Sequence, residues 1–140
     1  MAKKTLKSTK ARAWKVFSEY IRKRDADKNG ICTCITCGVK KHWSQMQAGH
    51  GMAGRMNSIL FSKELVSAQC QPCNVFRGGN YDEYHKVLLE RHGEEGYYEL
   101  LRLKHGKDKD GKDLNVKFTI EGLEEMIKGW KEEMKGFKCR

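Results

Sequence analysis

Long hydrophobic runs are missing from this 140-residue sequence. No window approaches the roughly 18 consecutive apolar residues that identify a membrane-spanning helix, so we expect no membrane partner. The lysines near the start are not followed by an apolar stretch, so a secretory signal peptide is not expected either. We therefore expect a cytoplasmic protein.

Hydrophobic residues are few, at 39% of the chain, and the mean hydropathy is -0.76. A single domain of this size buries a small core, so apolar burial alone stabilises it modestly. There is one proline, Pro72, and neither an internal repeat nor a low-complexity segment. These features indicate one small domain to which a bound metal ion would add the stability that the core lacks.

Acidic residues are scarce in the first 80 positions. Residues 1–30 hold ten Lys and Arg against three acidic residues, a net +7, and residues 31–80 hold five against one, a net +4. Residues 81–140 hold thirteen against fourteen, a net -1, so the basic half precedes them. A surface this basic attracts polyanions and indicates nucleic acid as the partner. The alternative is a basic protein without such a partner.

Cysteine, in contrast, is plentiful, with six in the chain. Four of them form two C-x-x-C pairs, Cys34 with Cys37 and Cys70 with Cys73. Four thiolates in two such pairs match a closed tetrahedral zinc site with no open coordination position, so we expect one structural zinc ion per chain. In a reducing cytoplasm, metal ligation is a better interpretation than disulfide bonds.

Two cysteines stand outside this pattern. Cys32 lies two residues before Cys34 and is the rival zinc ligand, whereas Cys139 near the end of the chain is expected to be a bystander. The alternatives for the whole set are buried free thiols or a redox pair.

Apolar residues at helical spacing predict helices at both ends of the chain. The first is expected over about 9–25, after a disordered basic tail over 1–8. Further helices are expected over 80–93, 94–105 and 119–137. Two short strands are expected between these helices, near 45–50 and 59–67, with a glycine-containing loop joining them.

One histidine and one asparagine are placed for chemistry within the cysteine frame. His50 stands between two glycines, where the backbone can bend and a substrate can approach closely. A neutral imidazole near pH 7 can act as a general base. Asn74 directly follows Cys73, and its amide oxygen can ligate Mg²⁺ or Mn²⁺. The alternatives are a solvated or packed histidine and an ordinary turn asparagine.

Four cationic side chains are candidates for contacts with nucleic-acid phosphates. Arg55 lies in the loop after His50, and Arg77 follows the second cysteine pair. Arg22 and Lys23 lie near the end of the first predicted helix, largely outside its apolar stripe. Guanidinium and ammonium groups bind phosphate oxygens, although each of these side chains can also be a solvated charge.

Together these features resemble the HNH, or ββα-metal (His-Me finger), nucleases, and most closely the phage NinG/Rap recombination endonucleases. A more distant resemblance is to junction resolvases of the endonuclease VII type. The resemblance covers roughly residues 14–100. The residues that carry it are Tyr20-Ile21-Arg22-x-Arg24-Asp25, Cys34-Ile35-Thr36-Cys37-Gly38, Ala48-Gly49-His50, Phe61, Gln69-Cys70-x-x-Cys73-Asn74, Gly79-Asn80, Tyr84 and Leu88.

The resemblance implies an α+β fold, mostly helical overall, in which a small zinc-stapled β-hairpin and helix hold one divalent cation. His50 is then the general base, and Asn74 is a ligand of a catalytic Mg²⁺ or Mn²⁺. The implied activity is that of an endonuclease that hydrolyses branched or duplex DNA. Holliday junctions formed during phage recombination, in the cytoplasm of the bacterial host, are the expected substrates.

The sequence departs from that resemblance at two positions. Gly49 stands where many HNH enzymes carry an acidic metal ligand, so the second ligand of the cation is unassigned. The middle asparagine of the HNH signature falls on Glu64 or Leu65. Another group must therefore orient His50, and we expect either Asn57 or a backbone carbonyl to do so.

The chain is expected to divide into a basic N-terminal arm and helix over 1–30, a zinc-stapled nuclease core over 31–93 and a helical extension over 94–140, within one compact domain. A homodimer that forms through the helix over 120–137 is an open alternative to packing of that helix on its own chain. The rival function is a zinc-stapled DNA-binding module without catalysis.

Overall fold

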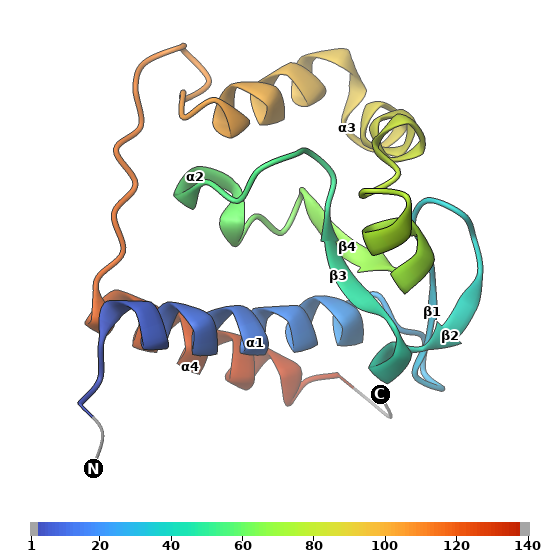
Figure 1. Cartoon of the computed structure of the whole chain (residues 1–140), viewed down its shortest axis with the longest axis horizontal. Helices are drawn as coiled ribbons and strands as arrows, with labels where there is room; N and C mark the ends of the chain where they lie inside the picture. Colours follow the sequence, from blue (N-terminus) through green and yellow to red (C-terminus); the bar gives the residue numbers. More distant parts are fainter. Residues whose placement is uncertain (1–2, 138–140) are drawn as a thin grey trace.

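The computed structural model describes residues 3–137, so Cys139 lies outside the described residues. The fold is an α+β arrangement, as expected. Figure 1 shows a central β-hairpin, with two long helices along one side of it and a bent helix on the other. The elements are α1 (Leu6–Arg24), β1 (Ile31–Thr33), β2 (Lys40–His42), η1 (Trp43–Gln45), β3 (Gln47–His50), α2 (Asn57–Leu60), β4 (Val66–Gln69), η2 (Pro72–Phe76), α3 (Tyr81–Lys104) and α4 (Ile120–Met134).

The central hairpin pairs β3 with β4 in antiparallel register, Gln47 opposite Gln69 and His50 opposite Val66. The strand expected near 45–50 is confirmed by β3. The strand expected over 59–67 was wrong for 59–65, because α2 takes up Ile59 and Leu60 and a turn follows over 61–65; only its last two residues belong to β4.

A short helix forms there because the turn buries two consecutive apolar side chains, Ile59 and Leu60, in the core. A second hairpin, β1 with β2, was not predicted, since its three-residue strands carry no alternating pattern.

Helices α1 and α4 pack together beneath the central hairpin. Their shared core cluster comprises Ala13, Val16, Phe17, Tyr20, Ile21, Ala48, Val66, Leu123, Ile127 and Trp130. The apolar stripe of α4 is therefore buried on its own chain, as expected, and not left for a dimer partner. The prediction of a disordered tail over 1–8 was wrong in part, because α1 begins at Leu6. The start of this helix is stabilised by a capping box between Thr5 and Ser8.

The other side of the hairpin is covered by α3, which contains both helices expected over 80–105. They meet at Gly93, whose φ of 71° and ψ of 175° interrupt the helix. A second core cluster fills the space between α3, α2 and the hairpin, and it comprises Met52, Ile59, Leu65, Tyr84, Leu88 and Leu100. Within residues 3–137, no helix combines the length and the apolarity needed to cross a bilayer.

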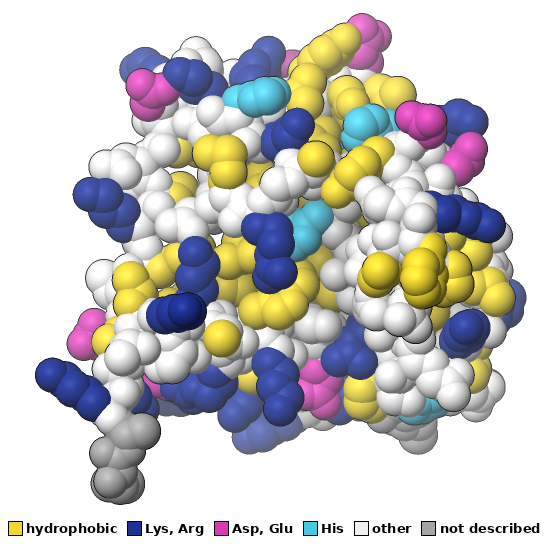
Figure 2. Space-filling view, in the orientation of Figure 1, with side chains coloured by type: hydrophobic (Ala, Val, Ile, Leu, Met, Phe, Trp, Pro, Cys, Tyr) yellow, Lys and Arg dark blue, Asp and Glu magenta, His cyan; other side chains and the backbone are white. Residues whose placement is uncertain are grey.

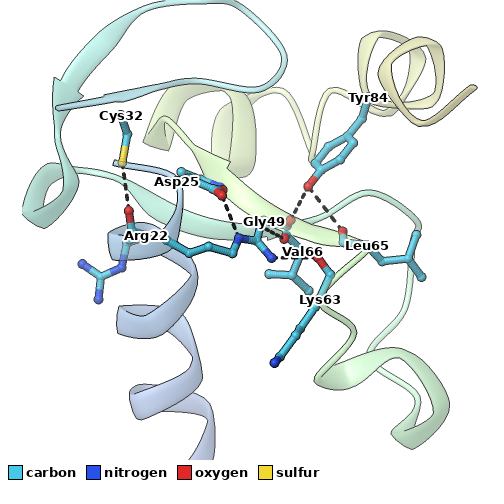
Figure 3. Close-up of polar contacts among 10 residues, drawn as sticks. Arg22, Asp25, Cys32, Gly49, Lys63, Leu65, Val66 and Tyr84 are labelled. Atoms are coloured by element: carbon cyan, nitrogen blue, oxygen red, sulfur yellow. Dashed lines mark hydrogen bonds and ion pairs between the residues drawn. The ribbon is translucent and has the colours of Figure 1, made fainter. Parts of the chain in front are cut away.

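Polar contacts hold the hairpin from the α1 side, at the point where that helix ends (Figure 3). The Asp25 carboxylate accepts the Ala68 backbone N–H at 2.8 Å, and it also accepts Arg24 Nε at 2.8 Å. The same guanidinium donates to the carbonyls of Lys63 and Val66 at 2.8 and 3.0 Å. The start of β4 is thus fixed relative to α1.

From the opposite side, the buried Tyr84 hydroxyl of α3 donates to the carbonyl of Gly49 at 2.8 Å and lies 3.3 Å from that of Leu65 (Figure 3). Burial raises the pKa of Tyr84 above its ordinary value, so the hydroxyl keeps its proton and remains a donor. This contact fixes the end of β3 that carries His50.

Replacing Tyr84 by Phe should lower the free energy of unfolding by about 1–2 kcal/mol, because a buried carbonyl loses its donor. Urea denaturation followed by circular dichroism measures the change. Tyr98→Phe is the matched control, since Tyr98 is 48% exposed. Equal urea midpoints for the Tyr84 variant and the wild type would contradict the role given to this hydroxyl.

Candidate functional site

The four cysteines of the two C-x-x-C pairs come together at one end of the central hairpin. Cys34 and Cys37 lie between β1 and β2, Cys70 follows β4, and Cys73 lies in η2. Their Sγ atoms all lie within 4.8 Å of one another, with 3.6 Å between those of Cys37 and Cys70. Sulfurs around a tetrahedral zinc ion lie about 3.8 Å apart. The cluster can therefore hold a structural metal ion such as zinc.

Hydrogen-bond donors surround the sulfurs, as expected around thiolate ligands. Cys34 Sγ accepts the Cys70 N–H at 3.3 Å, and Cys73 Sγ accepts from Arg77 Nη1 at 3.7 Å and from Asn80 Nδ2 at 3.6 Å. Burial raises the pKa of Cys34, but the hydrogen bonds to its sulfur outweigh burial and lower the pKa to about 6. The pKa of Cys73 is also lowered, whereas burial raises that of Cys70, so two of the four thiols are shifted toward the deprotonated form that binds a metal.

Cys32, the rival ligand, is not part of this cluster. Its Sγ donates to the Arg22 carbonyl at 3.0 Å (Figure 3). Burial raises the pKa of Cys32 to about 11, so it is a protonated thiol at neutral pH. The set of four that the spacing predicted is the set that the fold assembles.

His50 lies at the end of β3 and is held in one orientation. Its ring stacks on the Trp14 indole of α1, with centroids 5.2 Å apart and 14° between the planes. Its Nε2 lies 3.1 Å from the Leu60 carbonyl. Because that carbonyl can only accept, Nε2 carries the proton and the lone pair is on Nδ1.

The Leu60 carbonyl is available because it belongs to the last residue of α2, where carbonyls have no partner within the helix. A backbone carbonyl thus orients His50, which is one of the two expected alternatives. Asn57 does not serve in this way: its Oδ1 accepts from Lys10 Nζ at 2.8 Å, and its Nδ2 donates to the Val116 carbonyl at 3.0 Å.

The surroundings of His50 favour its neutral form. Burial lowers its pKa below the ordinary value of 6.5, the bond to the Leu60 carbonyl raises it, and the positive charge of Arg55 lowers it further. The net direction is downward, so the imidazole is neutral at pH 7 and can accept a proton at Nδ1.

Asn74 lies in the single π-helical turn η2, directly after the second cysteine pair. Its Nδ2 donates to Gln47 Oε1 on β3 at 2.6 Å, which fixes the amide. Its Oδ1 faces Gly49: a Cβ atom on that glycine would lie 3.1 Å from it. The Asn74 amide oxygen is therefore directed toward Gly49 of β3. A divalent cation bound to this oxygen would need a second protein ligand near the same strand.

One cavity of about 530 Å³ brings several of the predicted residues together. Its lining residues are Trp14, Ser18, Arg22, Met46, Gln47, Ala48, His50, Gly54, Arg55, Asn74 and Tyr81. Figure 2 shows one face of the molecule with Lys and Arg side chains spread across it and most acidic side chains near its edges. His50, Asn74 and the two arginines Arg22 and Arg55 thus border one basic cavity.

The four predicted cationic residues divide into two pairs. Arg22 and Arg55 line the cavity, and the Arg55 guanidinium lies 4.5 Å above the Trp14 ring. Lys23 instead pairs with Glu19 at 2.9 Å, and its Nζ lies 4.7 Å from the centre of the Trp43 ring. Arg77 is exposed and lies beside the cysteine cluster. Lys23 and Arg77 therefore lie outside the cavity lining.

Three residues of the site were missed in the sequence. Trp14 was assigned to the apolar stripe of the first helix, yet it contacts both His50 and Arg55. Gln47 holds Asn74, and Tyr81 lines the cavity. No local signal distinguishes them, because their roles depend on which elements pack together.

Comparison with known proteins places the chain in a family. The model of the family described as Bacteriophage Lambda NinG protein matches residues 1–139. The chain belongs to the NinG family. The ninG proteins of Escherichia phage 933W and Enterobacteria phage VT2-Sa are each 30% identical to it over 89 residues, 63% of this chain and 42% of theirs. The chain therefore matches less than half the length of these relatives, and no solved structure matches it.

The resemblance to NinG proteins that the sequence predicted is thus confirmed, and the family is one of bacteriophage proteins. The names of the relatives carry no statement about enzymatic activity. What this NinG-family chain does must therefore be inferred from its site.

Zinc content provides a test of the cysteine cluster. Protein purified without chelator should contain one zinc per chain by elemental analysis. Cys70→Ser should lose the metal and several kcal/mol of folding free energy, since the ion binds the folded state. Cys32→Ser should keep one zinc, because its sulfur is outside the cluster. Well under one zinc per wild-type chain would exclude a structural zinc site.

Proposed function

We propose that the protein is a metal-dependent DNA endonuclease of the HNH type. The observation that best supports this function is that an oriented neutral histidine, His50, and Asn74, whose amide is held by Gln47, border one basic cavity. A β-hairpin followed by a helical turn, with a four-cysteine cluster at its base, agrees with the ββα-metal arrangement. The DNA substrates are branched recombination intermediates, Holliday junctions among them, in the cytoplasm of the phage-infected cell.

The residues of the chain carry out the proton transfer. His50 Nδ1 accepts a proton from the attacking water, and the Leu60 carbonyl stabilises the imidazolium that forms. Trp14 keeps the imidazole plane in place by stacking. The lowered pKa leaves most of the histidine in its basic form at neutral pH.

The donor set at Asn74 fits a hard divalent cation, because Mg²⁺ and Mn²⁺ prefer oxygen ligands and the amide presents its oxygen. When bound there, the cation supplies positive charge next to the scissile phosphate. Arg55 and Arg22 are placed on the cavity wall to hold the other phosphate oxygens.

DNA as the partner is supported by the charge distribution. Residues 1–80 hold fifteen Lys and Arg against four acidic residues. A second hollow, lined by Lys7, Lys10, Trp14 and Arg55 among others, continues from the site along α1, so basic side chains accompany the path a backbone would take. Resolution of a four-way junction needs two active sites, so we expect a homodimer on that substrate.

The rival function is a zinc-stapled DNA-binding module without catalysis. It is favoured by one observation, the glycine at position 49, where related nucleases carry an acidic ligand. Such a module would use the cysteine cluster and the basic surface, but it would have no need of an oriented His50.

Cleavage assays separate the two functions. Wild-type protein should cut supercoiled plasmid or a four-way junction in Mg²⁺ or Mn²⁺ and not in EDTA. His50→Ala should cut at least about 100-fold more slowly, because general base catalysis is lost. His42→Ala, which alters an exposed histidine on β2, is the control and should behave as wild type. Tight DNA binding without cleavage in either metal would establish the binding module instead.

The pH dependence of cleavage tests the environment of His50. Activity should be lost as the pH falls through the pKa of His50, which lies below 6.5. Arg55→Gln removes a positive charge that lowers this pKa, so the acid limb should move to higher pH. Arg77→Gln is the control and should leave the limb in place. An acid limb that Arg55→Gln does not move would contradict the electrostatic role of Arg55.

A further inference from the structure

We propose that Gln69 supplies the second protein oxygen for the divalent cation, next to Gly49, where the absence of a side chain lets Gln69 Oε1 approach the strand. This inference rests on the proposed function and assigns the ligand that the sequence left open. Gln69 is the last residue of β4, and its side chain comes from the strand that pairs with β3.

The geometry brings two amide oxygens to one point. In the hairpin register, Gly49 and Gln69 lie on the same face of the sheet, because residues two apart along a strand share a face. A Cβ atom on Gly49 would overlap Gln69 Oε1 and would lie 3.1 Å from Asn74 Oδ1. Both oxygens therefore converge from different elements on the position of the missing side chain.

Such convergence is what a small hard cation requires. Neighbouring oxygen ligands of Mg²⁺ or Mn²⁺ lie about 3 Å apart around the ion. Each amide is also fixed at its nitrogen end, so neither oxygen can turn away without breaking a hydrogen bond. Asn74 is fixed by its Nδ2 bond to Gln47.

Gln69 is fixed even more firmly. Its Nε2 donates to the Gly79 carbonyl at 2.8 Å and to Thr36 Oγ1 at 3.0 Å. Since the carbonyl can only accept, the nitrogen must lie at that end of the amide and Oε1 must face Gly49.

The oxygen of Gln69 lacks a hydrogen-bond partner. The side chain is fully buried, and among the described residues nothing donates a hydrogen bond to Oε1. An unsatisfied buried acceptor costs about 1–3 kcal/mol, so its retention calls for a reason. A cation held jointly with Asn74 satisfies it.

A purely structural role explains only half of this side chain. The two bonds from Nε2 tie β4 to the first cysteine turn and to the loop before α3. That role accounts for Nε2 and leaves Oε1 unexplained. The two roles make different predictions for metal affinity.

Mn²⁺ binding to the zinc-loaded protein without DNA tests the inference directly. Electron paramagnetic resonance of free Mn²⁺ should show one bound ion per wild-type chain. Gln69→Ala should weaken this binding tenfold or more, roughly the effect of losing a metal-supporting group, while zinc content stays at one. Gln45→Ala, an exposed glutamine in η1, is the matched control and should bind as wild type.

A compensating variant guards against loss of folding in Gln69→Ala. Gly49→Asp alone should be poorly accommodated, because its Cβ would overlap Gln69 Oε1. Combined with Gln69→Ala, the aspartate enters the space that the amide leaves, so the double variant should recover Mn²⁺ affinity.

The outcomes distinguish this inference from the proposed function. Unchanged Mn²⁺ affinity in folded Gln69→Ala with zinc still bound would overturn the role of Gln69 and leave the nuclease proposal standing. Absence of any Mn²⁺ binding by the wild type, with or without DNA, would overturn both.

Discussion

The convergence of four cysteine sulfurs is the constraint on which the rest of the site depends. It joins the turn after β1 to η2, two segments that the small apolar core would hold only weakly by itself. Gln69 precedes Cys70 and Asn74 follows Cys73, so both proposed cation ligands are direct neighbours of cluster residues. A metal ion held by the four sulfurs would therefore do more than add stability: it would also fix Cys70 and Cys73 relative to each other, and with them the neighbouring amides of Gln69 and Asn74.

The central hairpin separates the two proposed chemical roles by its own pleat. Adjacent residues of a strand point to opposite faces, so Gly49 faces α3 and η2 while His50 faces α1. His50 is held by Trp14 and Leu60 on one side, and the amide oxygens of Gln69 and Asn74 lie on the other. Contacts from Asp25 and Tyr84 hold the strands between these layers, so neither face can shift without disturbing both.

Much of this organisation is predictable from the sequence, but unevenly. The helices follow from apolar periodicity, and the cysteine set follows from spacing, because a C-x-x-C pair brings two ligands together within one turn. The strand expected over 59–67 failed because Ile59 and Leu60 find their burial in a helical turn, and a short apolar run does not reveal which form it takes. Trp14 was taken for core because a helical stripe does not indicate which of its residues borders a cavity.

The sequence by itself determined the kinds of chemistry available: a zinc-type ligand set, one histidine between glycines, one asparagine after the last cysteine and a basic N-terminal half. Only the tertiary structure decided how these groups are arranged. It directed the Leu60 carbonyl to His50, excluded Cys32 from the cluster, and fixed the Gln69 amide with its oxygen toward Gly49. These arrangements depend on hydrogen bonds between residues ten or more positions apart, whose approach is set by the packing of whole elements and not by any local pattern.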